Sequence, residues 1–221
     1  MTFSILYLLI TVLLVPPLAN LSGRVPLPVA KSGNLIPHNI LMSLLNRNYV
    51  KPRLKTKLFE ISEIINSKND KLKVAYLDAN FPFIDGFPLL PHLSHDDGKK
   101  VDISFFYTKD EVAGNYKPSN TGYGIFVEPE DSESDQSALC KKRGHWQYDY
   151  SKFLTLGSRG DLEFDDSNTR RMIQLFAQDK STYKIFLEPH LKDRMNLKST
   201  KIRFQGCHSV RHDDHIHLSV Y

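Results

Sequence analysis

The sequence has very little cysteine, with only Cys140 and Cys207 among 221 residues. Two cysteines exclude a disulfide-rich scaffold and a zinc site of four thiolates, and they leave either one disulfide or two free thiols. The excess of positive charge is also small, because 29 Lys and Arg residues are balanced by 25 Asp and Glu residues, which gives a net charge of +4. Such a small and scattered excess argues against nucleic acid as a partner, whereas an anionic polymer or a membrane surface remains compatible with it.

Several common functional patterns are missing as well. The chain contains no internal repeat, no glycine-rich phosphate loop and no Gly-x-Ser-x-Gly elbow of the serine hydrolases. Hydrophobic residues make up 41% of the chain and charged residues 24%, a balance that excludes a disordered or collagen-like protein. The length leaves room for one ordinary domain, so we expect one hydrophobic core.

An uncharged apolar run opens the chain, from Phe3 to Ala19. A run of this kind is the core of a signal peptide, a short membrane anchor or a buried helix. It is shorter than the roughly 20 apolar residues that span a bilayer, and Pro16-Pro17 would end a helix early. We assign residues 1–20 to a signal peptide or membrane anchor. Either predicts an exported protein, periplasmic or anchored outside the cytoplasm, in which the two cysteines are able to pair.

The remainder divides into a linker and one domain. Residues 21–38 are rich in prolines and small residues without periodicity, which predicts a linker, and residues 39–221 form the domain. The polar stretch at 109–142 is expected to be a surface loop. Apolar spacing and turn residues predict helices at 40–45, at 58–65, after the N-cap candidates at 165–167 and from 189, and strands at 73–81, 101–107, 183–187, 202–207 and 215–221.

This order of elements predicts the fold class. Helices and strands are partly segregated along the chain, and the last two strands are close enough in sequence to pair antiparallel. We therefore expect an α+β fold, with a small antiparallel sheet and flanking helices that carry a metal site, preceded by a hydrophobic N-terminal helix. The pattern does not favour a doubly wound parallel sheet.

The nine histidines are unevenly distributed. Five of them fall in two short windows, 92–95 and 212–217. An isolated histidine such as His38 is usually a surface residue or a satisfied core residue, but clustering of this degree indicates a shared site. In a strand, His215 and His217 project from one face about 6.6 to 6.8 Å apart along the chain. Both imidazoles can therefore address the same site.

Asp102 lies inside an apolar strand, seven residues after His95. A carboxylate there is costly unless it is paired or bound to a cation, and the polar turn at 96–100 can bring His95 back toward it. Two imidazoles, one carboxylate and an open fourth position are the donor set of a catalytic zinc site, because structural sites close all four positions and favour thiolates. We predict one Zn²⁺ in preference to a binuclear centre.

The spacing of these residues is familiar. His95-x6-Asp102, followed near the C-terminal end by His215-x-His217, resembles the zinc peptidases of the lysostaphin, D-alanyl-D-alanine carboxypeptidase and sonic hedgehog superfamily. The D,D-carboxypeptidase branch usually has an acidic residue where this chain has His215. The likeness covers about residues 85–102 and 202–220.

Two further histidines bring the pattern closer to one family. His92-x2-His95 before Asp102, together with His212-x2-His215-x-His217, looks like the penicillin-insensitive murein endopeptidases. The resemblance implies that His95, Asp102 and His217 are the zinc ligands, and that His215 is the catalytic base. An imidazole suits that role because its unperturbed pKa of about 6.5 lies near the operating pH.

Four other residues are expected around the metal. We group His212 with His215 as catalytic, and we place His92 beside the ligands. His212 and His92 can each orient the base, support a ligand or donate a hydrogen bond to an oxyanion. The alternative for each is a residue in a solvated turn. Trp146 can form a wall of a substrate groove, and Arg203 can meet a substrate carboxylate bidentately. Core packing and plain surface charge are the respective alternatives for these two.

These expectations describe an exported zinc metallopeptidase that hydrolyses peptide bonds in peptidoglycan stem peptides or their cross-links. Direct attack by water forms no acyl-enzyme, so beta-lactams should not inhibit it. A D,D-carboxypeptidase is the alternative reaction. Two other classes remain open: a non-catalytic, zinc-bearing cell-wall binding module of the hedgehog type, and a protein that stores or senses metal through its histidines.

Overall fold

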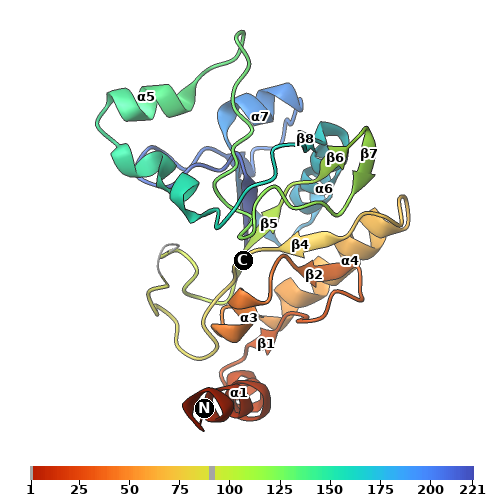
Figure 1. The fold of residues 1–221 in the computed structure, drawn as a ribbon, viewed down its shortest axis with the longest axis vertical. Coiled ribbons are helices and arrows are strands. Elements are labelled where there is room, and N and C mark those ends of the chain that lie inside the picture. Colours follow the sequence, from red (N-terminus) through yellow and green to blue (C-terminus); the bar gives the residue numbers. More distant parts are fainter. Residues whose placement is uncertain (1, 90–92) are drawn as a thin grey trace.

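A mixed six-stranded sheet lies at the centre of the computed structural model, which describes residues 2–89 and 93–221 (Figure 1). Its strands follow the order β10-β9-β11-β5-β4-β2. β11 pairs antiparallel with β5 and β9, whereas β10 pairs parallel with β9 and β2 parallel with β4. The strands are β2 (Leu35–Pro37), β4 (Val74–Tyr76), β5 (Lys100–Ser104), β9 (Thr182–Phe186), β10 (Ile202–Arg203) and β11 (His215–Val220).

The predicted α+β class is confirmed, but the expectation of an antiparallel sheet is wrong. The last two strands do not pair with each other, because β9 lies between them. The chain leaves β9 through helix α7 (Pro189–Arg194) and returns as β10. A crossover of this kind gives parallel strands, and it places β10 at the outer edge of the sheet.

The alternation of side chains separates the two faces of the sheet. One face carries apolar residues that belong to the main core, and α4 (Pro52–Asn66) and α6 (Asp166–Gln178) contribute their apolar sides to the same core. Asp165 caps α6 as expected, since its carboxylate accepts the N–H of Asn168. The buried strand residues of this face are Val101, Ile103, Ile185, Ile202, Ile216 and Leu218. The opposite face is left for polar side chains.

Smaller elements complete the fold. β1 (Val25–Pro26) pairs with β3 (Tyr49–Val50), and a separate sheet has the order β7-β6-β8, with β6 at Tyr107–Lys109, β7 at Val112–Gly114 and β8 at Glu163–Phe164. The remaining helices of the domain are α3 (Leu41–Leu44), α5 (Gln136–Lys142) and the 3₁₀ segment η2 (Trp146–Leu154). The polar stretch expected as a surface loop therefore contains strand β7 and helix α5.

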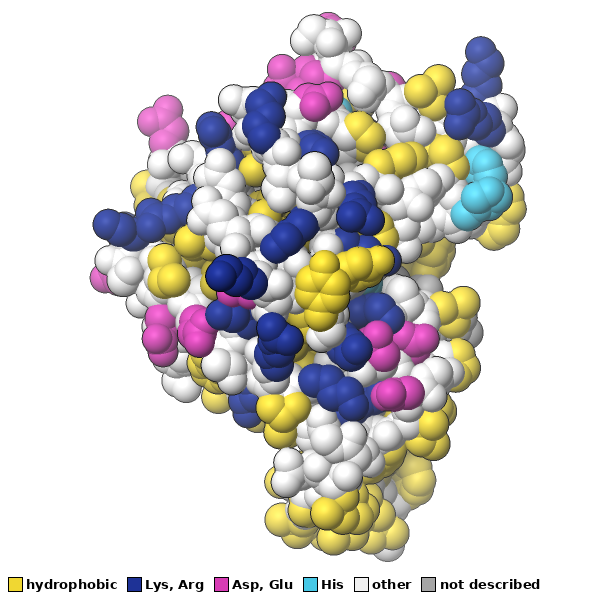
Figure 2. All heavy atoms as spheres, turned by 180° about the vertical axis from the view of Figure 1, so that it is seen from behind, with side chains coloured by type: hydrophobic (Ala, Val, Ile, Leu, Met, Phe, Trp, Pro, Cys, Tyr) yellow, Lys and Arg dark blue, Asp and Glu magenta, His cyan; other side chains and the backbone are white. Residues whose placement is uncertain are grey.

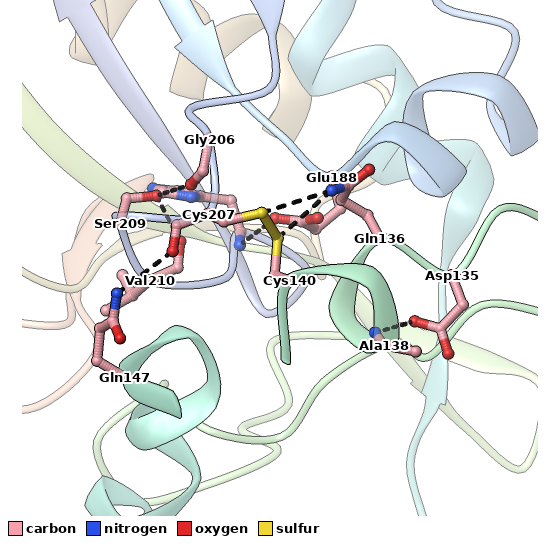
Figure 3. Close-up of a disulfide and its surroundings, with 11 residues drawn as sticks. Asp135, Gln136, Ala138, Cys140, Gln147, Glu188, Gly206, Cys207, Ser209 and Val210 are labelled. Atoms are coloured by element: carbon pink, nitrogen blue, oxygen red, sulfur yellow. Dashed lines mark hydrogen bonds between the residues drawn. A yellow bond between two sulfur atoms is a disulfide. The ribbon is translucent and has the colours of Figure 1, made fainter. Parts of the chain in front are cut away.

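Cys140 and Cys207 form a disulfide (Figure 3). The bond joins α5 to the loop that follows β10, across 67 residues of sequence. The Gln136 side chain lies against both sulfur atoms, and the Gln147 side chain donates to the Cys207 carbonyl at 3.4 Å. Of the two states that the sequence left open, the structure has the bridge.

The N-terminal helix projects at one end of the molecule, opposite α5 and α7 (Figure 1). It runs through α1 (Thr2–Leu9), the π-helical turn η1 (Ile10–Leu14) and α2 (Val15–Leu21). By length and composition this 20-residue helix can cross a membrane, and only 11% of it is buried. Figure 2 shows hydrophobic side chains covering this end. The apolar helix and the disulfide are consistent with export.

The two prolines do not end the helix, contrary to the expectation from sequence. Pro16 and Pro17 fall in the first turn of α2, directly after the π-helical turn. In a first turn the missing proline N–H takes no hydrogen bond away from the helix that follows. The helical segment therefore continues to Leu21, two residues beyond Ala19, where the apolar run ends.

The C-terminal end of this helix is attached to the domain. Val15 and Ala19 pack against Tyr49 and the partly buried Phe83. Arg24 follows in a fully buried position, pairs with Asp85 and donates to backbone carbonyls of the segment between β4 and β5. Residues 21–38, expected to be a linker, contain strands β1 and β2.

Candidate metal centre

His95, Asp102 and His217 converge in the interior, at the polar face of the sheet. In the pairing of β11 with β5, His217 lies directly opposite Asp102, so their side chains project side by side. His95 arrives from the segment that precedes β5. Its Nε2 atom lies 3.1 Å from Asp102 Oδ1 and 3.1 Å from His217 Nδ1, and the last pair, His217 Nδ1 and Asp102 Oδ1, is separated by 2.9 Å.

A hydrogen bond fixes which nitrogen of His95 carries the proton, and this favours a cation at the point where the three donor atoms meet. Its Nδ1 donates a hydrogen bond to the Ala79 carbonyl at 2.9 Å, which leaves the Nε2 lone pair facing the other two residues. Burial lowers the pKa of His217 to about 4, so this ring is neutral near pH 7. A carboxylate oxygen and neutral imidazole nitrogens at such short range are the donors that a divalent cation brings together.

The distances also agree with tetrahedral coordination. Zinc bonds of about 2.0–2.1 Å in a tetrahedron separate neighbouring ligand atoms by about 3.3 Å, close to the spacing of this group. The His217 atom that faces the other two donors is Nδ1. Its Nε2 is buried without a hydrogen-bond partner in the described part of the chain and can carry the proton of the neutral ring, which leaves the Nδ1 lone pair for a cation. The group can therefore hold one metal ion, with His95, Asp102 and His217 as its protein ligands.

Tyr123 holds the second oxygen of the aspartate. Its hydroxyl donates to Asp102 Oδ2 at 2.8 Å. Burial and the negative charge of Asp102 raise the pKa of Tyr123, so the phenol stays a donor. Gly122 and Gly124 flank it with positive φ, and a Cβ on either would collide with Leu77 or with the backbone of residue 151. Only glycine fits on both sides of this tyrosine.

Replacing Tyr123 with phenylalanine is expected to weaken metal affinity by about 10- to 100-fold, as removal of a residue supporting a ligand typically does. Competition titration with a zinc chelator measures the affinity. Tyr107→Phe is the matched control, because the Tyr107 hydroxyl is buried without a hydrogen-bond partner in the described residues. Equal affinity in the Tyr123 variant and the wild type would contradict the assignment of Tyr123 to the ligand support.

His215 and Asp214 form a second pair beside the ligands. His215 Nδ1 hydrogen-bonds to Asp214 Oδ1, and Asp214 Oδ2 accepts the N–H of Gly124 at 2.6 Å. The other ring nitrogen, His215 Nε2, lies 3.7 Å from Asp102 Oδ2. A carboxylate behind an imidazole fixes its tautomer and stabilises the charged ring. This arrangement suits an imidazole that takes up and releases a proton.

His212 lies next to His215 in the pocket wall. Its ring centroid is 5.0 Å from that of His215 and 6.1 Å from that of His217. Phe186 supports the His212 ring at 5.6 Å, and Glu188 accepts the His212 backbone N–H at 3.1 Å. The structure thus brings His212 to the same site as the ligand group.

A pocket of about 470 Å³ opens over this group. Asp102 and His217 line it, whereas His95 is fully buried and is not part of the lining. The loop after β10 supplies one wall, and residues just after the undescribed segment supply another. Its lining residues are Leu93, Ser94, Asp102, Gln147, Tyr150, Gln205, His208, Ser209, Val210, His212, His215 and His217.

Of three further residues expected around the metal, two do not line this pocket and the third lies outside the described residues. Trp146 is 79% exposed on η2 and lines a different hollow, with Lys141 and Asp149. Arg203 is exposed on β10, where its Nε donates to the Thr200 carbonyl at 3.1 Å. His92 falls among residues 90–92, outside the residues that the structure describes.

The structure also adds residues that sequence reasoning missed. Tyr123 supports Asp102, and Asp214 supports His215. The Gly-Tyr-Gly sequence at 122–124 was a signal of an unusual backbone, and Asp214 directly precedes a histidine of the cluster. Neither pattern indicates a partner by itself. The contact of Tyr123 joins segments that are far apart in sequence, and the contact of Asp214 depends on the turn before β11.

Comparisons with known proteins assign no family. A scan against protein-family models finds no match for this chain, and a search of curated proteins finds none either. The function is therefore argued from the site and from the spacing of its residues.

Proposed function

We propose that this protein is an exported zinc metallopeptidase that hydrolyses peptide bonds in peptidoglycan stem peptides or their cross-links. The observation that carries the proposal is the buried His95, Asp102 and His217 group beneath a pocket, with the His215 and Asp214 pair at its side. The spacing that resembles murein endopeptidases supports the same reaction. The apolar N-terminal helix and the disulfide support a location where peptidoglycan is accessible.

The residues of the chain would divide the work of hydrolysis. A Zn²⁺ ion held by His95, Asp102 and His217 would act as a Lewis acid, which polarises a carbonyl and lowers the pKa of water. His215, oriented by Asp214, takes the proton of the attacking water at Nε2 and passes it to the leaving amine. His212, in the wall beside it, hydrogen-bonds to the oxyanion that develops on the carbonyl. Tyr123 keeps Asp102 in position throughout.

Mass spectrometry of digested muropeptides tests the proposal. Purified full-length protein is incubated with cross-linked and uncross-linked muropeptides, with and without a chelator, and with penicillin. We expect hydrolysis that stops on chelation, returns with zinc and continues in penicillin, because no serine is acylated. Release of only terminal D-alanine from uncross-linked peptides would identify a D,D-carboxypeptidase.

The other outcomes separate the alternative classes. Intact muropeptides with a fully zinc-loaded protein would identify a binding module or a metal-handling protein. Loss of all hydrolysis on addition of penicillin would reject the mechanism, because it would indicate a covalent acyl-enzyme.

Replacing His215 with alanine is expected to reduce turnover by about 10²- to 10⁴-fold, the usual contribution of a general base, while most of the zinc is retained. Metal content is measured by atomic absorption and turnover by muropeptide cleavage. A zinc loss equal to that of a ligand variant would show that His215 belongs to the coordination sphere instead.

A further inference from the structure

The face of the sheet that carries the metal ligands continues onto β9 and β10. Phe186 lies opposite His217 in the pairing of β9 with β11, and the two rings are 5.5 Å apart. On the next strand, Arg203 lies beside Phe186. Residues paired in neighbouring strands project to the same face, as do residues two apart in one strand. Lys184 and Arg203 therefore extend the polar face beyond the metal group.

Both cations lie over aromatic rings. The Lys184 ammonium is 4.6 Å from the centroid of Phe186 and 5.4 Å from that of Tyr183, and the Arg203 guanidinium carbon is 6.0 Å from Tyr183. A shared ring keeps the two charges near each other. Within residues 2–89 and 93–221, neither side chain makes an ion pair with an acidic group.

The local charge is positive at this place. Lys100, on β5, is neutralised by Asp96 at 2.7 Å and Asp97 at 3.0 Å. Burial lowers the pKa of Lys184, and the positive charges of Lys100 and Arg203 lower it further. The negative charge of Asp97 opposes this effect only in part, because the pKa of Lys184 is still lowered overall. A negative group bound beside Lys184 and Arg203 would therefore be stabilised.

The distance between Lys184 and the metal group determines how long a peptide must be to contact both. The Lys184 ammonium contacts Phe186, and Phe186 contacts His217. These two contacts place the ammonium no more than about 10 Å from the His217 ring, which three residues of extended peptide span. Gln205, two residues after Arg203, already lines the pocket. A peptide lying in the pocket is therefore long enough to extend to Lys184, and Arg203 lies beside Phe186 on the same face of the sheet.

We propose that Lys184 and Arg203 form a subsite for a carboxylate of the peptide substrate, located within three residues of the bond that is cleaved. The inference rests on the proposed function, because it takes the pocket over His217 as the place of cleavage. The substrate class is thus an acidic peptide. Arg203 binds the carboxylate through its guanidinium fork, and Lys184 acts as a point charge on the Phe186 ring.

The test compares two forms of one peptide. A fluorescent stem tetrapeptide with free carboxylates, and the same peptide with its carboxylates converted to carboxamides, are titrated into the zinc-loaded His215→Ala protein, which binds without turnover. We expect the acidic form to bind about tenfold more tightly, with a preference that decreases as salt is added. Lys184→Gln combined with Arg203→Gln is expected to bring the two affinities together.

Lys180→Gln is the matched control, because it removes one positive charge from the segment before β9. Lys180 is exposed and makes no ion pair among the described residues. This variant should keep the full preference for the acidic peptide. A preference that survives in the Lys184 and Arg203 double variant would overturn the subsite, and so would equal binding of both peptides by the parent protein.

Cleavage by the wild type separates the two proposals. Hydrolysis of both peptides without any preference would leave the peptidase standing and remove the subsite. A preference lost in the double variant, with no hydrolysis by the zinc-loaded wild type, would keep the subsite and refute the peptidase.

Discussion

Replacing His217 with alanine is expected to abolish zinc binding and hydrolysis together. His217 lies opposite Asp102 in the strand pairing, and its Nδ1 is close to donor atoms of both His95 and Asp102. Without His217 only two protein ligands remain. Loss of a residue that merely supports a ligand lowers metal affinity by up to about 100-fold, so loss of a ligand should lower the zinc affinity further. Because the proposed reaction needs the metal, turnover should fall by about 10³-fold or more.

Two measurements on each variant check this result, namely zinc content after dialysis and muropeptide cleavage. His145→Ala is the control for the loss of an imidazole, since His145 lies outside the ligand group. It should keep its zinc. Retention of stoichiometric zinc in His217→Ala would refute the assignment of the ligand group, whatever the effect on activity.

Removing the disulfide is the second change with a large expected effect. The bridge between Cys140 and Cys207 closes a segment with a sequence separation of 67. The loss of chain entropy that such a closure imposes on the unfolded state corresponds to about 4 kcal/mol of stability. Cys140→Ser combined with Cys207→Ser should lower the free energy of unfolding by about this amount, as measured by denaturant titration.

The same variant should also bind substrate less well. Cys207 lies in the loop after β10, between Gln205 and His208, which both line the pocket. A loosened loop should raise KM more than it changes the zinc content. Reduction of the wild type by a thiol should reproduce the stability loss, whereas the double variant should not respond to the thiol. An unfolding midpoint that is the same in wild type and variant would contradict this role of the bridge.

The ligand group was accessible to sequence reasoning because its geometry is largely local. His215 and His217 are two residues apart in a strand, which places them on one face whatever the partner strands are. His95 and Asp102 are separated by a short polar turn. A single pairing, between β11 and β5, then brings the two halves together. That pairing follows from two apolar strands that each carry polar residues on one face.

The parts that sequence reasoning missed depend on contacts between distant segments. Nothing near Tyr123 in sequence reveals that its hydroxyl meets Asp102, because the contact needs the turn in which Gly122 and Gly124 both adopt positive φ. The strand order was wrong for a similar reason. Ile202 and Ile185 pair in parallel because α7 carries the chain back along β9, and proximity in sequence to β11 had suggested a different neighbour.

The attachment of α2 to the domain limits how the proposed peptidase would reach its substrate. Ala19 packs against the domain and Arg24 donates to its backbone, so the apolar helix is in direct contact with the body that holds the pocket. Were the helix to anchor the protein at a bilayer with these contacts kept, the pocket would be held at a constant height above the lipid surface. The proposed peptidase would then reach only the peptide bonds of its substrate that lie at that height.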